Sequence, residues 1–222
     1  MTKYNFILHT NYQKLSQAEM QERAEAFYQT MKRRRTVRDF SSEPIPQDII
    51  EHALLTAGTA PNGANMQPWH FVVVQNKELQ KQIRVEAEKV EKEFYDHKAP
   101  DYWLDALEPL GTDANKEYLE DAPCLIVIFT QKHTILPDQS IKKHYYINES
   151  VGIATGMLIT AIHNAGLVSL THTPKPMLFL RDLLERPKHE TPFLILAVGY
   201  PKENVKVPDI TKKSLDEIAT FK

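Results

Sequence analysis

Four short apolar runs limit most strongly which folds this chain can adopt. They are HFVVV (70–74), CLIVIFT (124–130), LVSLTHT (167–173) and FLILAVGY (193–200). Runs of this length that are rich in β-branched and aromatic residues are typical of strands. Helical patterns separate the runs, and short strands that alternate with helices predict an α+β fold, a mixed α/β sandwich. We expect one domain over residues 1–222.

The segments between these runs contain recognisable helix ends. Ser16 followed by Glu19 is a capping-box pattern, which predicts a first helix from about residue 17 into the arginines. A second helix is expected to close at Gly58, which can adopt the left-handed conformation, and a third to begin after Asn76. Residues 144–165 predict a further helix, apolar on nearly every side, which therefore needs cover from the sheet or from another subunit.

The composition excludes several classes of protein. The chain has 222 residues, 42% of them hydrophobic, and a net charge of −2, which is unlike a general nucleic-acid binder. No apolar run reaches the length of a membrane span and the start of the chain has no signal-peptide core, so we expect a cytoplasmic protein. Cys124 is the single cysteine and cannot form an internal disulfide, so we expect a core thiol.

Motifs for several common chemistries are absent. The seven glycines include no GxG pair, which excludes a dinucleotide fingerprint. The nine histidines show no HExxH and no Cys/His cluster, so no metal site is expected. The remaining candidates indicate a site for anions and aromatic groups: basic residues near 34–38, amides at 61–64, hydroxyls at 171–173 and a lysine near 212.

The loop within the stretch 56–74 is the first candidate for this site. Pro61, Asn62 and Gly63 favour a tight, irregular backbone whose amide groups point outwards, where they bind acceptor oxygens. The strand that follows would hold the loop in place. An ordinary connection between a helix and a strand is the alternative.

The third helix provides the second candidate. Glu91 and Tyr95 are four residues apart and share a face, where they can present a carboxylate and a hydroxyl to one ligand. The alternative is a solvated helix held by i,i+4 pairs such as Glu88 with Lys92. The segment from about 91 to 120, which is broken by Pro and Gly and contains Lys116, is expected to be an active-site lid.

Several of these stretches together resemble the flavin-dependent nitroreductase superfamily. They are RRRTVRDF, TAGTAPNGANMQPWHFVVV, NAGLVSLTHTP and VGYP. The stretches HYYINESVGIATGMLITAIHNAGLV, ERPKHE and VPDITKKSLDEI, with the spacing of Glu91, Tyr95 and Lys116, are similar to the iodotyrosine deiodinases within it. The resemblance covers nearly the whole chain from about residue 30. It implies a nitroreductase-like fold, a central and mostly antiparallel sheet flanked by helices, in an intertwined homodimer.

The resemblance also implies an FMN cofactor. Guanidinium groups suit the FMN phosphate, and fixed donors beside the ring tune the redox states of the flavin. Thr173 matches the residue whose hydroxyl bonds the flavin N5. By position, the implied FMN contacts are Arg34, Arg35, Thr36, Val37, Arg38, Asn62, Thr171, His172, Thr173 and Lys212.

For the substrate, the resemblance implies a zwitterionic amino acid. Glu91 matches the contact to the ammonium, Lys116 the contact to the carboxylate, and Tyr95 a contact to the same zwitterion. The backbone amide of Ala64 matches the contact to a phenolate, so Ala64 and Thr173 are the implied catalytic positions.

The implied activity is FMN-dependent reductive dehalogenation of 3-iodo-L-tyrosine and related halotyrosines to L-tyrosine and halide. An external reductant, NAD(P)H directly or through a reductase, would supply electrons. A broad-specificity FMN-dependent nitroreductase and a non-catalytic protein that binds flavin or aromatic amino acids are the alternatives. The chain departs from the family pattern at His172, where a hydroxyl residue is familiar, and at Lys212, where an arginine is. It also lacks the N-terminal anchor of the animal enzymes, which implies a soluble bacterial relative.

Overall fold

The computed structural model describes residues 4–222 and divides the chain into two units, residues 1–34 and 35–222. The first unit contains helix α1 (Gln17–Lys32). Ser16 caps this helix as predicted: its hydroxyl accepts from the backbone N–H of Glu19, and its own N–H donates to the Glu19 carboxylate at 2.9 Å. Local capping chemistry therefore suffices to set the start of α1.

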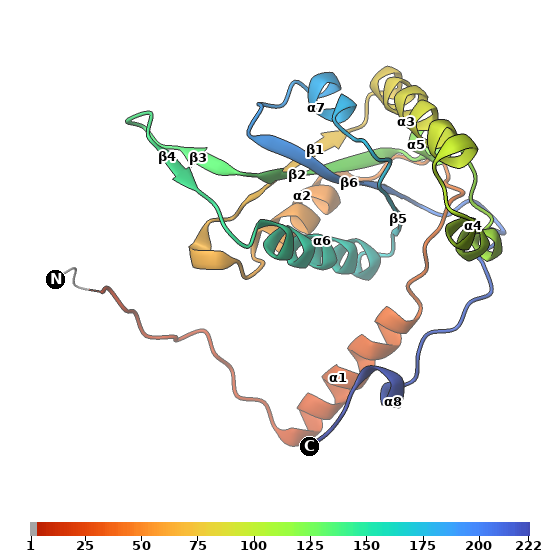
Figure 1. Ribbon diagram of the computed structural model, residues 1–222. Coiled ribbons are helices and arrows are strands. Elements are labelled where there is room, and N and C mark those ends of the chain that lie inside the picture. The colour runs from red at the N-terminus through yellow and green to blue at the C-terminus, as the bar shows by residue number, and fades with distance from the viewer. Residues whose placement is uncertain (1–3) are drawn as a thin grey trace. The chain divides into compact units, whose positions relative to one another are not determined.

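A four-stranded antiparallel sheet forms the centre of the second unit (Figure 1). Its order is β1 (Trp69–Val74), β2 (Cys124–Gln131), β6 (Glu190–Gly199) and β5 (Val168–His172). All four predicted strands are confirmed. Strand β6, the last in chain order, begins three residues earlier than predicted, because Glu190 and Thr191 pair with the end of β2.

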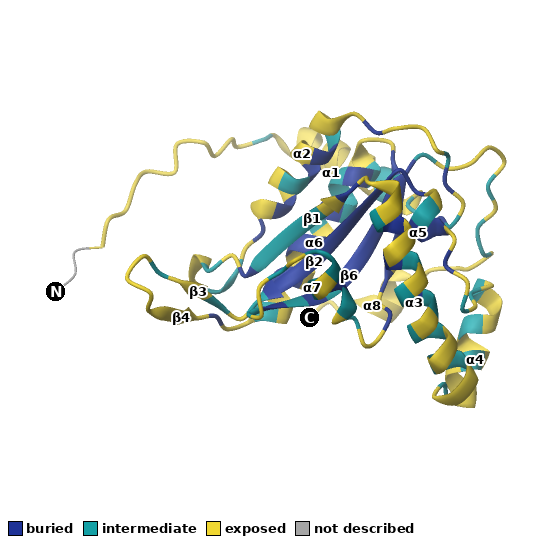
Figure 2. Cartoon of the chain, turned by 90° about the horizontal axis from the view of Figure 1, so that it is seen from above, coloured by how far each residue is buried: buried dark blue, intermediate teal, exposed yellow. Residues whose placement is uncertain are grey.

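Helices cover both faces of this sheet and create two separate cores. The odd-numbered side chains of β2, such as Val127, face the side of α3 (Lys77–His97), α5 (Tyr118–Asp121) and α7 (Phe179–Leu183). The even-numbered ones, such as Ile126, face α2 (Gln47–Gly58) and α6 (Ile147–Asn164). Because both faces are covered, β2 is buried along nearly its whole length (Figure 2), which explains its unbroken apolar sequence.

Two predicted helix ends differ from the structure. Gly58 lies inside the last turn of α2 and does not adopt a left-handed conformation, since the helix is capped by Thr59 at φ −83°. At the end of α6 the prediction is confirmed, because Gly166 follows the helix with φ +86°. Helix α6 begins at Ile147, three residues later than predicted, because Tyr146 before it adopts a left-handed conformation with φ +52°. A hairpin of β3 (His133–Ile135) and β4 (Ile141–Lys143) precedes it in the chain.

The remaining short elements lie in connections and in the tail. They are η1 (Gly63–Asn65), α4 (Asp101–Leu107), η2 (Glu108–Leu110) and α8 (Leu215–Ile218). Cys124 is fully buried, and burial raises the pKa of its thiol to about 12, as expected for a core cysteine. Within the described part of the chain, none of the helices has both the length and the apolar character that a membrane span needs.

Candidate active site

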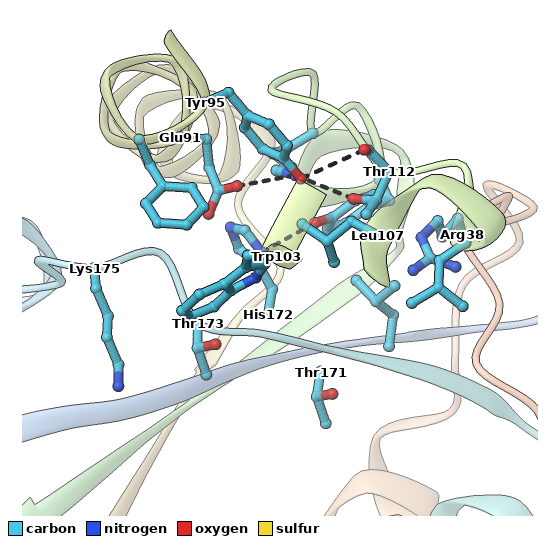
Figure 3. Close-up of a pocket in the computed structure, with 15 residues that line it drawn as sticks. Arg38, Glu91, Tyr95, Trp103, Leu107, Thr112, Thr171, His172, Thr173 and Lys175 are labelled. Carbon is cyan, nitrogen blue, oxygen red and sulfur yellow. Dashed lines mark hydrogen bonds and ion pairs between the residues drawn. The ribbon is translucent and has the colours of Figure 1, made fainter. Parts of the chain in front are cut away.

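A cavity of about 330 Å³ lies between the C-terminal half of α3, the segment that contains α4 and η2, and the end of β5 (Figure 3). It brings together residues that are up to 137 positions apart in the sequence, from 38 to 175. Its lining residues are Arg38, Glu91, Phe94, Tyr95, Trp103, Leu107, Leu110, Thr112, Lys116, Tyr118, Leu170, Thr171, His172, Thr173 and Lys175.

Lys116 and Glu91 form a buried ion pair in the wall of this cavity. The Nζ of Lys116 lies 3.1 Å from Oε2 of Glu91, with side-chain exposures of 3% and 14%. The ammonium also donates to the Asp113 carbonyl and, at 3.4 Å, to the Thr112 hydroxyl. A lysine is seldom buried unless its charge is paired, so this pair is a specific feature of the lid.

Tyr95 lies beside this pair, one helical turn after Glu91. Its ring centroid is 5.5 Å from Nζ of Lys116, and its hydroxyl donates to the Thr112 carbonyl at 3.4 Å. Burial raises the pKa of Tyr95, so the hydroxyl keeps its proton at neutral pH and is a donor. The three side chains that the spacing placed in one site are therefore brought together in the structure.

The lid is held to α3 by contacts that were not predicted. Glu88 does not pair with Lys92. Instead its Oε1 accepts from Nε of Arg84 at 2.8 Å and from the backbone N–H of Lys116 at 2.8 Å. In the cavity wall, Trp103 of α4 packs edge-on against Phe94, with ring centroids 5.2 Å apart. The bond from Lys116 to Glu88 spans 28 positions, and the contact of Trp103 with Phe94 joins two different helices, so spacing within α3 did not indicate either.

The end of β5 forms the opposite wall. Successive strand residues point to opposite faces, and here Thr171 and Thr173 are exposed while His172 is buried. The Nδ1 of His172 lies 3.0 Å from the hydroxyl of Tyr118. Burial, with a smaller effect from the charge of Lys116, lowers the pKa of His172 to about 3, so the imidazole is neutral. Burial raises the pKa of Tyr118.

The basic segment after α1 lies along this same edge of the sheet. Thr36 forms a parallel bridge with Ser169 of β5, and Arg38 lines the cavity. The guanidinium of Arg35 donates to the carbonyl of Pro208 in the C-terminal tail. Val37 is buried, so its side chain belongs to the core rather than to the cavity wall.

Two other predicted cofactor residues are not among those that line the cavity. Arg34 is the last residue of the first unit. Lys212 is exposed in the tail of the second.

The loop with Ala64 and Asn62 lies at the other edge of the sheet. It leads into β1, whereas Thr173 follows β5, and these are the two outer strands, about 14 Å apart by strand spacing (Figure 1). Asn62 braces the loop: its Oδ1 accepts from the Gln67 N–H at 2.8 Å. Ala64 has a φ of +46°, an uncommon conformation for a residue other than glycine. Within one chain, the Ala64 amide and the Thr173 hydroxyl do not belong to one cavity.

Sequence reasoning missed several residues that line the site. Trp103 and Lys175 line the cavity, and Tyr118 holds His172. Trp103 could have been selected as a large aromatic residue in a segment with no helical apolar face. Tyr118 carries no signal of its own in the sequence.

Comparison with known proteins agrees with this fold. Residues 31–200 match the model of the nitroreductase family, so the chain belongs to that family. Among its relatives are iodotyrosine deiodinases, including one from Haliscomenobacter hydrossis that is 51% identical over 195 residues, 88% of each chain. The iodotyrosine deiodinase of Nematostella vectensis is 44% identical, over 93% of this chain and 79% of the relative.

Solved structures lead to the same group. A structure of oxidized iodotyrosine deiodinase bound to FMN and 3-iodo-L-tyrosine superposes with a TM-score of 0.73 at 32% identity. The match covers 88% of this chain and 100% of that one. A BluB-like flavoprotein from Clostridium difficile 630, at 24% identity and a TM-score of 0.67, shares the fold.

Proposed function

We propose that this protein is an FMN-dependent reductive dehalogenase that converts 3-iodo-L-tyrosine and related halotyrosines to L-tyrosine and halide. The buried pair of Lys116 and Glu91 is the observation that carries the proposal. It places a cation and an anion in one cavity wall, and these match the carboxylate and ammonium of a free amino acid. The iodotyrosine deiodinases among the relatives, one of them solved with FMN and 3-iodo-L-tyrosine, support it.

The zwitterion would exchange partners with this pair. Lys116 would bind the carboxylate and Glu91 the ammonium, so one buried ion pair is replaced by two and neither protein charge is left unpaired. Tyr95 would donate its hydroxyl to the same zwitterion. Phe94 and Trp103 supply an apolar wall against which an aromatic side chain can pack.

The residues at the β5 edge fit an FMN cofactor. Arg35 uses one of its five guanidinium N–H donors on the carbonyl of Pro208, so donors remain for a phosphate; Arg34 and Lys212 would add charge. The exposed hydroxyls of Thr171 and Thr173 lie at the strand end, and that of Thr173 would donate to flavin N5. When bound and reduced, FMN would supply the two electrons that, with one proton, replace iodine by hydrogen on the ring and release iodide. NAD(P)H, directly or through a reductase, would restore them.

A homodimer would complete this site. Since Ala64 and Thr173 lie on opposite edges of the sheet, the amide that binds the phenolate and the hydroxyl at the flavin would come from different subunits. Helix α6 has open space beside Gly152 and Gly156 and exposes Ile153 by 46%, which a second subunit would cover. We propose one nitroreductase-like domain over residues 1–222, with a lid at about 91–120.

Anaerobic mixing tests the function. The purified protein should be yellow and release FMN on denaturation, and after reduction with dithionite it should be reoxidised by 3-iodo-L-tyrosine with release of iodide. Bound flavin without iodide release would favour a binding protein. A colourless protein that takes up no FMN would refute the proposal.

Substitutions separate the deiodinase from a broad-specificity reductase. Glu91→Gln or Lys116→Ala leaves one buried charge unpaired, so binding of iodotyrosine should weaken by about 2–5 kcal/mol. Matched controls on the same helix are Glu93→Gln and Lys92→Ala, whose side chains are 53% and 72% exposed. FMN content should be unchanged. Iodophenol should be a poor substrate that responds little to either variant, whereas equal turnover of iodophenol and iodotyrosine would favour the nitroreductase.

A further inference from the structure

One buried nitrogen at the cavity has no partner. Among residues 4–222, two buried side-chain atoms lack a hydrogen bond, Oε1 of Gln80 and Nε2 of His172, and of these residues His172 lines the cavity. His172 is 7% exposed. Buried polar atoms are nearly always hydrogen-bonded in folded proteins, so an unpaired one in the wall of a cavity indicates a group that binds there.

Tyr118 determines what this nitrogen can bind. The Tyr118 hydroxyl is buried, and Nδ1 of His172 is its one hydrogen-bond partner in the described part of the chain, at 3.0 Å. The hydroxyl keeps its proton and Nδ1 is the one acceptor it reaches, so we assign the hydroxyl as the donor and Nδ1 as the unprotonated nitrogen. The imidazole is neutral, so its single proton is on Nε2. His172 therefore presents an N–H donor and requires an acceptor.

The acceptor is best supplied by the substrate rather than by the flavin. Thr171 and Thr173 point to the opposite face of the strand end from His172, and they are the residues with hydroxyls for the flavin. On its own face His172 lies close enough to Lys116 for the lysine charge to act on it. A carboxylate has two oxygens, so one can accept from Lys116 while the other accepts from a neutral donor beside it.

We propose that His172 is a specificity-determining residue whose Nε2–H donates to the α-carboxylate of the aromatic amino acid held by Lys116. The inference rests on the proposed function and extends it to a position where the chain departs from the family pattern. With its tautomer fixed by Tyr118, His172 offers no acceptor to the cavity. It therefore favours the carboxylate and disfavours the ammonium at this end of the zwitterion, which a hydroxyl residue would not do.

Three probes test the inference on the FMN-loaded protein: 3-iodo-L-tyrosine, 3-iodotyramine without the carboxylate, and 3-(4-hydroxy-3-iodophenyl)propionate without the ammonium. His172→Phe should weaken binding of the two probes that carry a carboxylate by about 10-fold or more, as for loss of a hydrogen bond to a charged group. The affinity for 3-iodotyramine should change by less than about 3-fold. His172→Gln, which keeps a donor near Nε2, should restore most of the affinity. His172→Phe combined with Tyr118→Phe should match the single variant, which removes any effect of an unpaired Tyr118 hydroxyl.

Two results would overturn the inference while leaving the proposed function intact. One is an equal loss for all three probes together with weaker FMN binding, which would make Nε2–H a flavin contact. The other is an Nδ1–H tautomer for His172 in ¹⁵N spectra of the imidazole, assigned by its absence in His172→Phe. Failure of the proposed function is distinct, because the unmodified protein would then release no iodide from any probe.

Discussion

The carboxylate of Glu88 on α3 accepts a hydrogen bond of 2.8 Å from the backbone N–H of Lys116, 28 residues later in the chain. Through this bond α3 fixes the point where the lid returns to the core and where the Lys116 side chain enters the cavity. Glu88 touches no ligand in the proposed mechanism, so it is a positioning residue.

Glu88→Gln should loosen the lid. A hydrogen bond to a charged acceptor contributes about 1.5–3 kcal/mol, so amide exchange of residues 111–121 should become roughly 10-fold faster or more. The KM for iodotyrosine should rise more than kcat falls. Glu86→Gln is the control, since Glu86 pairs with the exposed Lys89 on the same helix. Unchanged exchange in Glu88→Gln would show that packing of Trp103 alone holds the lid.

Gly199 is expected to tolerate no side chain. A Cβ there would lie 2.6 Å from Cδ of Pro123 and 3.0 Å from Phe40. Gly199→Ala should therefore lower the free energy of unfolding by about 1–3 kcal/mol through overpacking. Gly58→Ala is the comparison, because nothing lies within 4 Å of its Cβ position and the helix favours alanine by about 0.5–1 kcal/mol. Denaturant titration measures the free energy of unfolding of both variants, and equal values would contradict the close packing around Gly199.

The stability of the protein should fall in acid partly through His172. Its pKa is about 3 in the folded state against 6.5 unfolded, so between these values the unfolded chain binds more protons. The contribution of His172 is complete above pH 6.5 and decreases, by up to about 1.4 kcal/mol per pH unit, as the pH falls towards 3. His172→Gln should show a shallower decrease between pH 6.5 and 4 in denaturant titrations. Parallel curves for the two proteins would mean that the imidazole is already solvated in the native state.

The proposed division of the site between subunits can be tested by complementation. Lys116→Ala removes the lid contact, and Gly63→Val should displace the Ala64 loop because Tyr145 and Tyr146 lie 3.2 and 3.3 Å from the Cβ position of Gly63. Each homodimer should be nearly inactive. In a re-equilibrated 1:1 mixture half of the dimers are mixed and each has one intact site, so activity should recover to about one quarter of wild type. No recovery would place both residues in a site built from one chain.

Cys124 should resist thiol reagents in the folded state. It is fully buried in β2, and its pKa of about 12 leaves almost no thiolate at pH 8. Labelling with a disulfide reagent should proceed only at the rate of unfolding and become fast in denaturant. Rapid labelling of protein that retains its fold and FMN would show that this part of the sheet opens locally.

Patterns over a few neighbouring residues were enough to predict the regular elements. The four strands follow from apolar runs, and the start of α1 at Ser16 and of α3 after Asn76 follow from caps that bond the next turn. One prediction from a local signal was wrong. Glycine can adopt a left-handed φ, but Gly58 stays helical in the last turn of α2. The short hairpin of β3 and β4 was not predicted, because its exposed strands have no apolar period.

The sequence by itself determined the four strands, the helices between them, and the shared face of Glu91 and Tyr95, since each depends on residues close together in the chain. Only the tertiary structure decided that Lys116 is buried against Glu91, that Glu88 serves the lid, and that Ala64 and Thr173 stand on opposite edges. The reason is physical. These relationships depend on the order in which strands pair and on the path of the lid, and contacts such as that of Thr36 with Ser169 join positions whose spacing in the chain contains no information about their distance in space.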